Sequence, residues 1–118
     1  MISAKITGIG NDAISEKDGL VILFDKTATP DLKKVAVIQE IRDLNHSDFN
    51  LKKGGQIKIG SDSYQIEFVG SLVNNNLKTI GHTTLVFKEV PTNPLESAVY
   101  LRPGEFPSFE VGEEIQYI

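Results

Sequence analysis

Apolar residues alternate with polar ones, or follow one another, in short runs that recur along the whole chain. In the first run Ile2, Ala4 and Ile6 are separated by polar residues, and this period of two is typical of a half-buried β-strand. Glycine, proline and asparagine, which favour turns and loops, lie between the runs. The pattern predicts strands at 2–10, 20–25, 35–42, 56–59, 64–69, 82–90, 97–101 and 113–118.

The clearest hairpin consists of the runs 56–59 and 64–69, which flank four residues that include a glycine. Thr29 and Pro30 suit the cap and the first position of one short helical turn. The segment 71–81 contains three asparagines and is expected to be a turn or a short frayed helix. With about seven or eight short strands and no long helix, an all-β barrel or sandwich is indicated. We expect a small closed or partly closed antiparallel β-barrel.

Length and composition narrow the class of protein further. A chain of 118 residues has the size of one domain, so residues 1–118 are expected to form a single barrel. Cysteine is missing, which excludes disulfides, thiolate nucleophiles and cysteine-ligated metals. The N-terminus does not have the pattern of a signal peptide, and the apolar runs are too short to span a bilayer, so we expect a cytoplasmic protein without membrane insertion. Twelve basic residues against 16 acidic ones argue against nucleic-acid binding.

His82 is the sharper of the two histidine candidates for chemistry. It stands directly after Gly81 at the start of the run 82–90, on the side opposite the core-like Leu85 and Phe87. A histidine that is neutral near pH 7 can act as a nucleophile or shuttle a proton, and the glycine lets a ligand approach backbone N–H groups. The alternative is a histidine at a strand start that hydrogen-bonds a neighbouring loop.

Two other polar residues raise similar questions. Gln39 is a lone amide in a row with Val35, Val37 and Ile41, so it either faces a polar pocket or bonds to backbone near the strand end. His46 lies in a polar loop, where a solvated histidine is the simple interpretation. The two histidines do not have the spacing of a recognisable metal site, so no metal is predicted.

Three motifs together point to a known family. They are "ITGIG" near the N-terminus, "PDLKKVAVIQEIRDL" in the middle and "VGSLVNNNLKTIGHTTLVF" in the second half, of which the last is the most specific. With these motifs the chain resembles the glucitol/sorbitol-specific IIA component family of the bacterial phosphoenolpyruvate:sugar phosphotransferase system, over essentially its whole length. Members of that family are small cytoplasmic β-barrel proteins, which agrees with the strand pattern.

The resemblance implies a phosphoryl relay. A histidine phosphocarrier protein would give its phosphoryl group to a histidine of the IIA protein, which would pass it to the IIB domain of a membrane sugar permease. Such a transfer needs an exposed neutral imidazole nitrogen with in-line geometry and nearby hydrogen-bond donors. It requires no metal and no organic cofactor.

The chain departs from the family pattern at one position. The phosphoacceptor histidine of the family falls on Gln39, whose amide is not nucleophilic, whereas His82 matches the "GH-TL" motif and is implied to bind or orient phosphate. Two hypotheses therefore stay open. One is a functional IIA component, in which either His82 carries the phosphoryl group or the family's histidine aligns one register away from Gln39. The other is a non-phosphorylatable relative that acts as a binding or regulatory module. We also predict that Gln39 and His82 lie on adjacent strands and face one shallow site.

Overall fold

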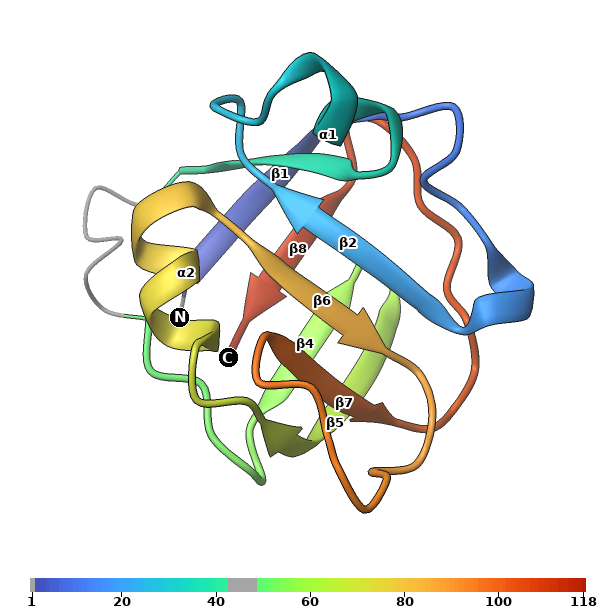
Figure 1. Ribbon diagram of the computed structural model, residues 1–118, viewed down its shortest axis with the longest axis vertical. Coiled ribbons are helices and arrows are strands. Elements are labelled where there is room, and N and C mark those ends of the chain that lie inside the picture. The colour runs from blue at the N-terminus through green and yellow to red at the C-terminus, as the bar shows by residue number, and fades with distance from the viewer. Residues whose placement is uncertain (1, 43–48) are drawn as a thin grey trace.

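The structure, a computed structural model, describes residues 2–42 and 49–118. Eight strands form its framework (Figure 1). In chain order they are β1 (Ile2–Ile9), β2 (Leu20–Phe24), β3 (Val37–Ile41), β4 (Gln56–Ile59), β5 (Asp62–Val69), β6 (Thr83–Val86), β7 (Ala98–Arg102) and β8 (Glu114–Tyr117). Within residues 2–42 and 49–118 the helical elements are a single 3-10 turn η1 (Glu16–Asp18) and two short α-helices, α1 (Pro30–Lys34) and α2 (Val73–Ile80). His46 lies outside the described residues.

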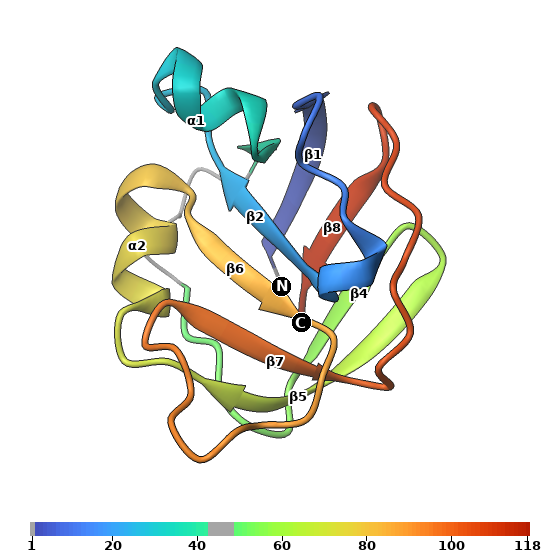
Figure 2. The ribbon, with the colours of Figure 1, turned by 45° about the vertical axis from the view of Figure 1, so that its right-hand side comes forward.

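The eight strands close into one barrel in the order β1-β3-β2-β6-β7-β5-β4-β8 (Figure 2). The C-terminal strand β8 closes it, because β8 pairs with both β1 and β4 and leaves neither as a free edge. The predicted closed barrel of short strands is thus confirmed. Its sheet is mixed, however, because β2 pairs with β3 in parallel, and β6 with β7. The antiparallel prediction did not account for these two pairs, whose connections carry α1 and a long loop.

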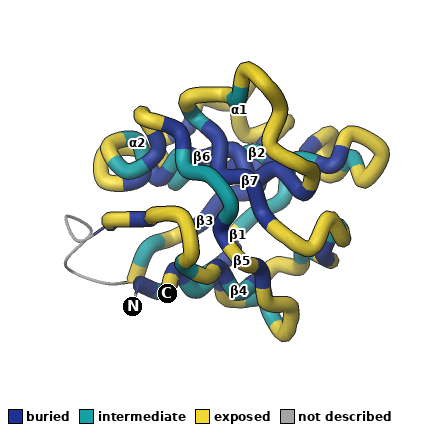
Figure 3. The backbone as a smooth tube through the Cα atoms, turned by 90° about the horizontal axis from the view of Figure 1, so that it is seen from below, coloured by how far each residue is buried: buried dark blue, intermediate teal, exposed yellow. Residues whose placement is uncertain are grey.

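Local sequence signals set several of these elements. The predicted hairpin forms between β4 and β5, in register from Ile59 opposite Asp62 to Gln56 opposite Gln65. Helix α1 begins as expected, with the Thr29 hydroxyl accepting a hydrogen bond from the Leu32 backbone N–H. No residue of α1 is buried, and Figure 3 shows it exposed outside the barrel wall.

One face of each strand packs into the barrel interior, where the side chains form the main core. Along β6 and just beyond it, Thr83, Leu85 and Phe87 are buried toward the interior, as their alternation predicts. A second, smaller cluster covers part of the outside of the wall, formed by Ala28, Ala36 and Ile38 with Ile22 and Phe24 packed against it. The barrel wall therefore has an inner and an outer apolar face near β2 and β3.

Helix α2 is a regular two-turn helix where we expected a turn or a frayed helix. Val73 and Leu77 lie one turn apart and are both buried against the core. Gly81 ends the helix in the left-handed conformation, with φ +62°, and its N–H donates to the Asn76 carbonyl. The asparagines did not break the helix because one of them, Asn74, has a tertiary role.

Asn74 links α2 to the chain segment that precedes β4. Its Oδ1 accepts a hydrogen bond from the Leu51 N–H at 2.7 Å, and its Nδ2 donates to the Leu51 carbonyl at 3.0 Å. We expect Asn74→Ala to lower the free energy of unfolding by about 1–3 kcal/mol, because both backbone groups of Leu51 lose their partner. Urea unfolding followed by circular dichroism measures this change.

Asn75→Ala is the matched control, because Asn75 is an exposed neighbour on the same helix. It makes the same chemical change, and we expect less than about 0.5 kcal/mol from it. Equal losses from the two substitutions would show that the bonds to Leu51 contribute nothing specific to stability.

Within the described part of the chain, the longest α-helix has eight residues, and none has the length and apolar character needed to cross a membrane.

Candidate functional site

Gln39 lies in the middle of β3 and points into the barrel, in the same inward row as Val37. Its exposed fraction is 0%. Its Nε2 donates to the Gly81 carbonyl at 2.9 Å, and its Oε1 accepts from the Tyr117 hydroxyl at 2.6 Å. Gln39 thus bonds to one main-chain group, the Gly81 carbonyl just before β6, and to one side chain, that of Tyr117.

These partners fix which way the Gln39 amide faces. A carbonyl oxygen only accepts, so Nε2 must face Gly81 and Oε1 must face Tyr117. Tyr117 then has to donate its hydroxyl proton. Burial raises the pKa of Tyr117, and the hydrogen bond with Gln39 opposes this only in part, so the hydroxyl stays protonated far above neutral pH. The interior amide is thus held in one orientation.

Raised tyrosine pKa values have a consequence for stability at alkaline pH. Burial, and then the charges of Asp62 and Glu105, raise the pKa of Tyr64 from 10.0 to about 12. The folded state keeps this proton where the unfolded chain releases it, so the free energy of unfolding should fall between about pH 10 and 12. Tyr117 acts in the same direction. Urea unfolding at pH 9, 10, 11 and 12 gives the free energy of unfolding as a function of pH. The double variant Tyr64→Phe, Tyr117→Phe should lose less stability over this range than wild type, and an equal loss would contradict the assignment of the effect to these tyrosines.

His82 is placed by the turn that joins α2 to β6. Its backbone N–H donates to the Asn76 carbonyl at 3.2 Å, at the end of the helix. Across β2 the ring stacks on Phe24, with centroids 4.2 Å apart and planes 18° apart, and Nδ1 lies 3.0 Å from the Leu23 carbonyl oxygen. The side chain is half-buried. The backbone of His82, the plane of its ring and its Nδ1 atom are therefore each held by a specific contact.

The contact with Leu23 determines the tautomer of a neutral His82. A carbonyl cannot donate, so Nδ1 must carry the proton and donate it. Nε2 then has the lone pair, and within the described residues no hydrogen-bond partner contacts it. The neutral ring is therefore held as the tautomer whose Nε2 is a nucleophile.

Gln39 and His82 do not share a site in the way we predicted. Strand β2 lies between β3 and β6, so the two residues are not on adjacent strands (Figure 1). Their side chains also lie on opposite faces of the wall, because Gln39 faces the interior and His82 stacks on the outward Phe24. The prediction failed because strand order cannot be read from one strand's alternation. What joins them is the Gly81 carbonyl, which precedes His82 and accepts from Gln39.

A hollow of about 330 Å³ opens beside Gln39, between β3, the residues after β2 and the end of α2. Asp25, Lys26 and Lys78 lie on its polar wall, and Leu77 on its apolar wall. Gln39 is one of its lining residues although the side chain has no exposed surface. The sequence-based expectation of a pocket near Gln39 thus has a counterpart, but His82 is not among the described residues that line it.

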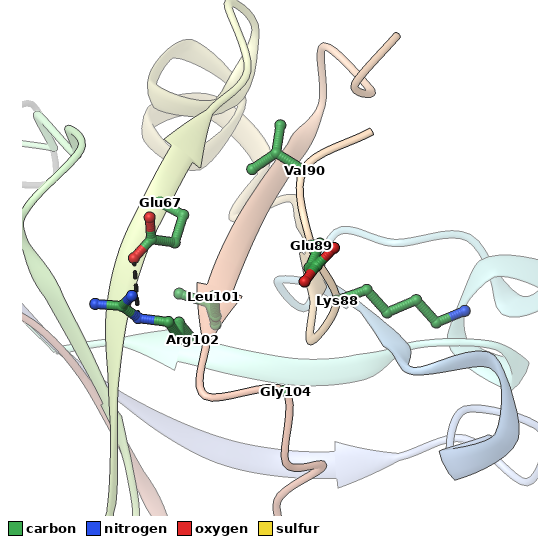
Figure 4. A pocket seen from close by; sticks show the side chains of 7 residues that line it. All are labelled: Glu67, Lys88, Glu89, Val90, Leu101, Arg102 and Gly104. Atoms are coloured by element: carbon green, nitrogen blue, oxygen red, sulfur yellow. Dashed lines mark ion pairs between the residues drawn. The ribbon is translucent and has the colours of Figure 1, made fainter. Parts of the chain in front are cut away.

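A wider depression of about 770 Å³ lies elsewhere, between β5, the end of β7 and the segment after β6 (Figure 4). Arg102 and Glu67 point toward one another there, with Nε and Oε1 3.2 Å apart, and Lys88 extends away from them. The described residues that line it include no histidine. Nor do three or more potential metal ligands gather anywhere in the described residues.

Sequence reasoning missed three residues that define the site: Tyr117, Leu23 and Phe24. Tyr117 carried a partial signal, because it alternates with Ile115 in the last run and so had to face inward. Leu23 contributes through its backbone carbonyl, which leaves no trace in a sequence. Phe24 required the pairing of β2 with β6, a contact between segments about 60 residues apart.

The fold is that of a IIA component of a phosphotransferase system. Residues 1–116 match the family model of the PTS system glucitol/sorbitol-specific IIA component, and the chain belongs to that family. The resemblance seen in the sequence is confirmed.

Individual relatives agree with this assignment. The PTS system glucitol/sorbitol-specific EIIA components of Escherichia coli (strain K12) and Shigella flexneri are each 35% identical to this chain. Both alignments cover 92% of this chain and 94% of the relative. The crystal structure of a PTS system IIA component from Enterococcus faecalis V583 superposes with a TM-score of 0.93 at 39% identity, over 98% of each chain.

Proposed function

We propose that this IIA component relays a phosphoryl group through Nε2 of His82. It would take the group from a histidine phosphocarrier protein and pass it to the IIB domain of a membrane sugar permease. The family supports a role as a IIA component, and the relay, its residue and its partners are our proposal.

The observation that carries the proposal is the bond from Nδ1 of His82 to the Leu23 carbonyl. It reserves Nε2 as the nucleophilic nitrogen, as a phosphoacceptor requires. The stacked Phe24 ring holds the imidazole plane, so that Nε2 keeps one direction of approach.

The bonds formed and broken in this phosphoryl transfer balance without a cofactor. The lone pair of Nε2 forms the new N–P bond while the N–P bond of the phosphocarrier breaks, and the carrier's imidazole leaves with that electron pair. The His82 ring gains positive character, which the Leu23 carbonyl dipole stabilises through Nδ1–H. Transfer to the IIB domain repeats the exchange in the opposite sense and regenerates neutral His82.

A second candidate function is a module that docks the same partners without carrying phosphate. The observation that favours it is Gln39, which stands where the family resemblance places the phosphoacceptor. Its amide is not nucleophilic, it has no exposed surface, and two hydrogen bonds hold it. In this alternative His82 would contribute only to a docking surface.

Intact-mass spectrometry separates the two functions. Wild-type protein is incubated with phosphoenolpyruvate, the general phosphotransferase enzyme and the histidine phosphocarrier, and then measured at alkaline pH. The relay predicts one added acid-labile phosphoryl group. If wild type gains none, the relay through His82 is wrong and the docking module is supported.

A further inference from the structure

We propose that Gln39 and Tyr117 position His82 from inside the barrel, as a buried chain of hydrogen bonds that ends on the peptide unit before the histidine. The inference rests on the proposed role of His82. In this proposal Gln39 is a positioning residue. The family pattern alone would describe position 39 only as the place where the phosphoacceptor histidine has been lost.

The first step is the geometry of one peptide unit. The carbonyl of Gly81 and the N–H of His82 belong to the same planar group. Gln39 donates to that carbonyl at 2.9 Å, and the His82 N–H donates to the Asn76 carbonyl at 3.2 Å. The unit is therefore held from both ends, by the barrel interior on one side and by the end of α2 on the other.

The second step is the tightness of the turn around this unit. Gly81 has φ +62°, and a Cβ at its position would lie 2.8 Å from the Cβ of Asp25 and 3.1 Å from its backbone nitrogen. The Asp25 N–H also donates to the Ile80 carbonyl. Since the turn packs directly against the end of β2, a rotation of the Gly81 peptide would displace His82 relative to Leu23 and Phe24, its own partners on that strand.

The third step is the role of Tyr117. Its hydroxyl donates to Oε1 of Gln39 at 2.6 Å, and this leaves only Nε2 to face Gly81. Tyr117 has an exposed fraction of 3%, and Phe49 packs edge-on against its ring with centroids 5.1 Å apart. The donor at the start of the chain is thus fixed by the core. The order of donation runs from Tyr117 to Gln39 to the Gly81 carbonyl.

Stability of the core would not by itself explain why an amide occupies position 39 in the barrel interior. A buried amide costs free energy unless it is fully bonded, and an apolar residue of similar volume would avoid that cost. The Gln39 amide can hold the Gly81–His82 turn in place through its hydrogen bond, which an apolar residue at position 39 could not do.

The test uses Gln39→Met, which keeps the volume and removes both bonds, and Tyr117→Phe, which removes only the orienting donor. Tyr64→Phe is the matched control, because Tyr64 is also buried and donates its hydroxyl to a backbone carbonyl, that of Glu105, at 2.7 Å. The first readout is the pair of ¹⁵N shifts of the His82 ring at pH 8, which reports the tautomer. The second is hydrogen exchange of the His82 amide.

We expect wild type and Tyr64→Phe to show the Nδ1–H tautomer and a protected His82 amide. Gln39→Met should shift the ring toward a tautomer mixture and speed exchange at His82 at least about tenfold, with Tyr117→Phe in between. Should Gln39→Met not fold, Tyr117→Phe decides alone. His82 shifts and exchange equal to wild type in a folded Gln39→Met protein, or in Tyr117→Phe when Gln39→Met does not fold, would overturn the inference. These readouts need no phosphate, so they fail or succeed independently of the relay.

Discussion

His82→Asn should lose phosphoryl transfer from the histidine phosphocarrier by more than about 10³-fold, because removing a nucleophile removes the covalent step. Asparagine is the informative substitute. Its Nδ2 can take the place of Nδ1 and keep the donation to the Leu23 carbonyl, while nothing replaces Nε2. The rate is measured by intact mass at successive times, with the phosphocarrier in excess.

The same variant should stay folded. The lost stacking on Phe24 costs about 0.5–1.5 kcal/mol beyond burial, which is a small part of the stability of a domain of this size. His46→Asn is the control for histidine chemistry elsewhere, and it should accept phosphate at the wild-type rate. If His82→Asn is phosphorylated as fast as wild type, His82 is not the acceptor.

Gly81→Ala should lower the free energy of unfolding by about 2–4 kcal/mol and slow phosphoryl transfer as well. A left-handed φ of +62° costs an alanine about 1–2 kcal/mol, and the contact with Asp25 adds a packing cost of similar size. The backbone nitrogen of Asp25 is part of that contact, so a side-chain rotation alone cannot relieve it. Urea unfolding gives the stability, and the mass assay gives the rate.

Gly54→Ala separates the two contributions. Gly54 also has a positive φ, +92°, but a Cβ there would meet no atom within 4 Å. We expect it to cost about 1–2 kcal/mol from backbone strain alone and to leave phosphoryl transfer unchanged. Equal losses of stability in the two variants would mean that the Asp25 contact contributes nothing.

The alternation of residues predicted most of the barrel because inward and outward positions obey the pleat of each strand. It placed Leu85 and Phe87 in the core and set the hairpin of β4 and β5. The alternation did not predict that β2 and β3 pair in parallel, because the direction of a neighbouring strand has no local signature in the sequence. Helix α2 was underestimated because asparagine disfavours helices on its own, whereas Asn74 binds Leu51 and Val73 and Leu77 anchor the helix in the core.

The candidate site was predictable in part for the same reason. His82 after a glycine and Gln39 in an apolar row both stood out as residues that their surroundings do not explain. Their relation did not, because it depends on strand order and on the carbonyl of Gly81, a group that every residue has. The sequence therefore singled out His82 and Gln39 but misjudged how they are connected.

The most direct test of the central claim is NMR of the phosphorylated wild-type protein with ¹⁵N-labelled histidine. The nitrogen that couples to phosphorus identifies the acceptor atom. Our account predicts phosphorus on Nε2 of His82, with Nδ1 still protonated and bonded to the Leu23 carbonyl. Phosphorus on Nδ1 of His82, on His46, or on no histidine would contradict it.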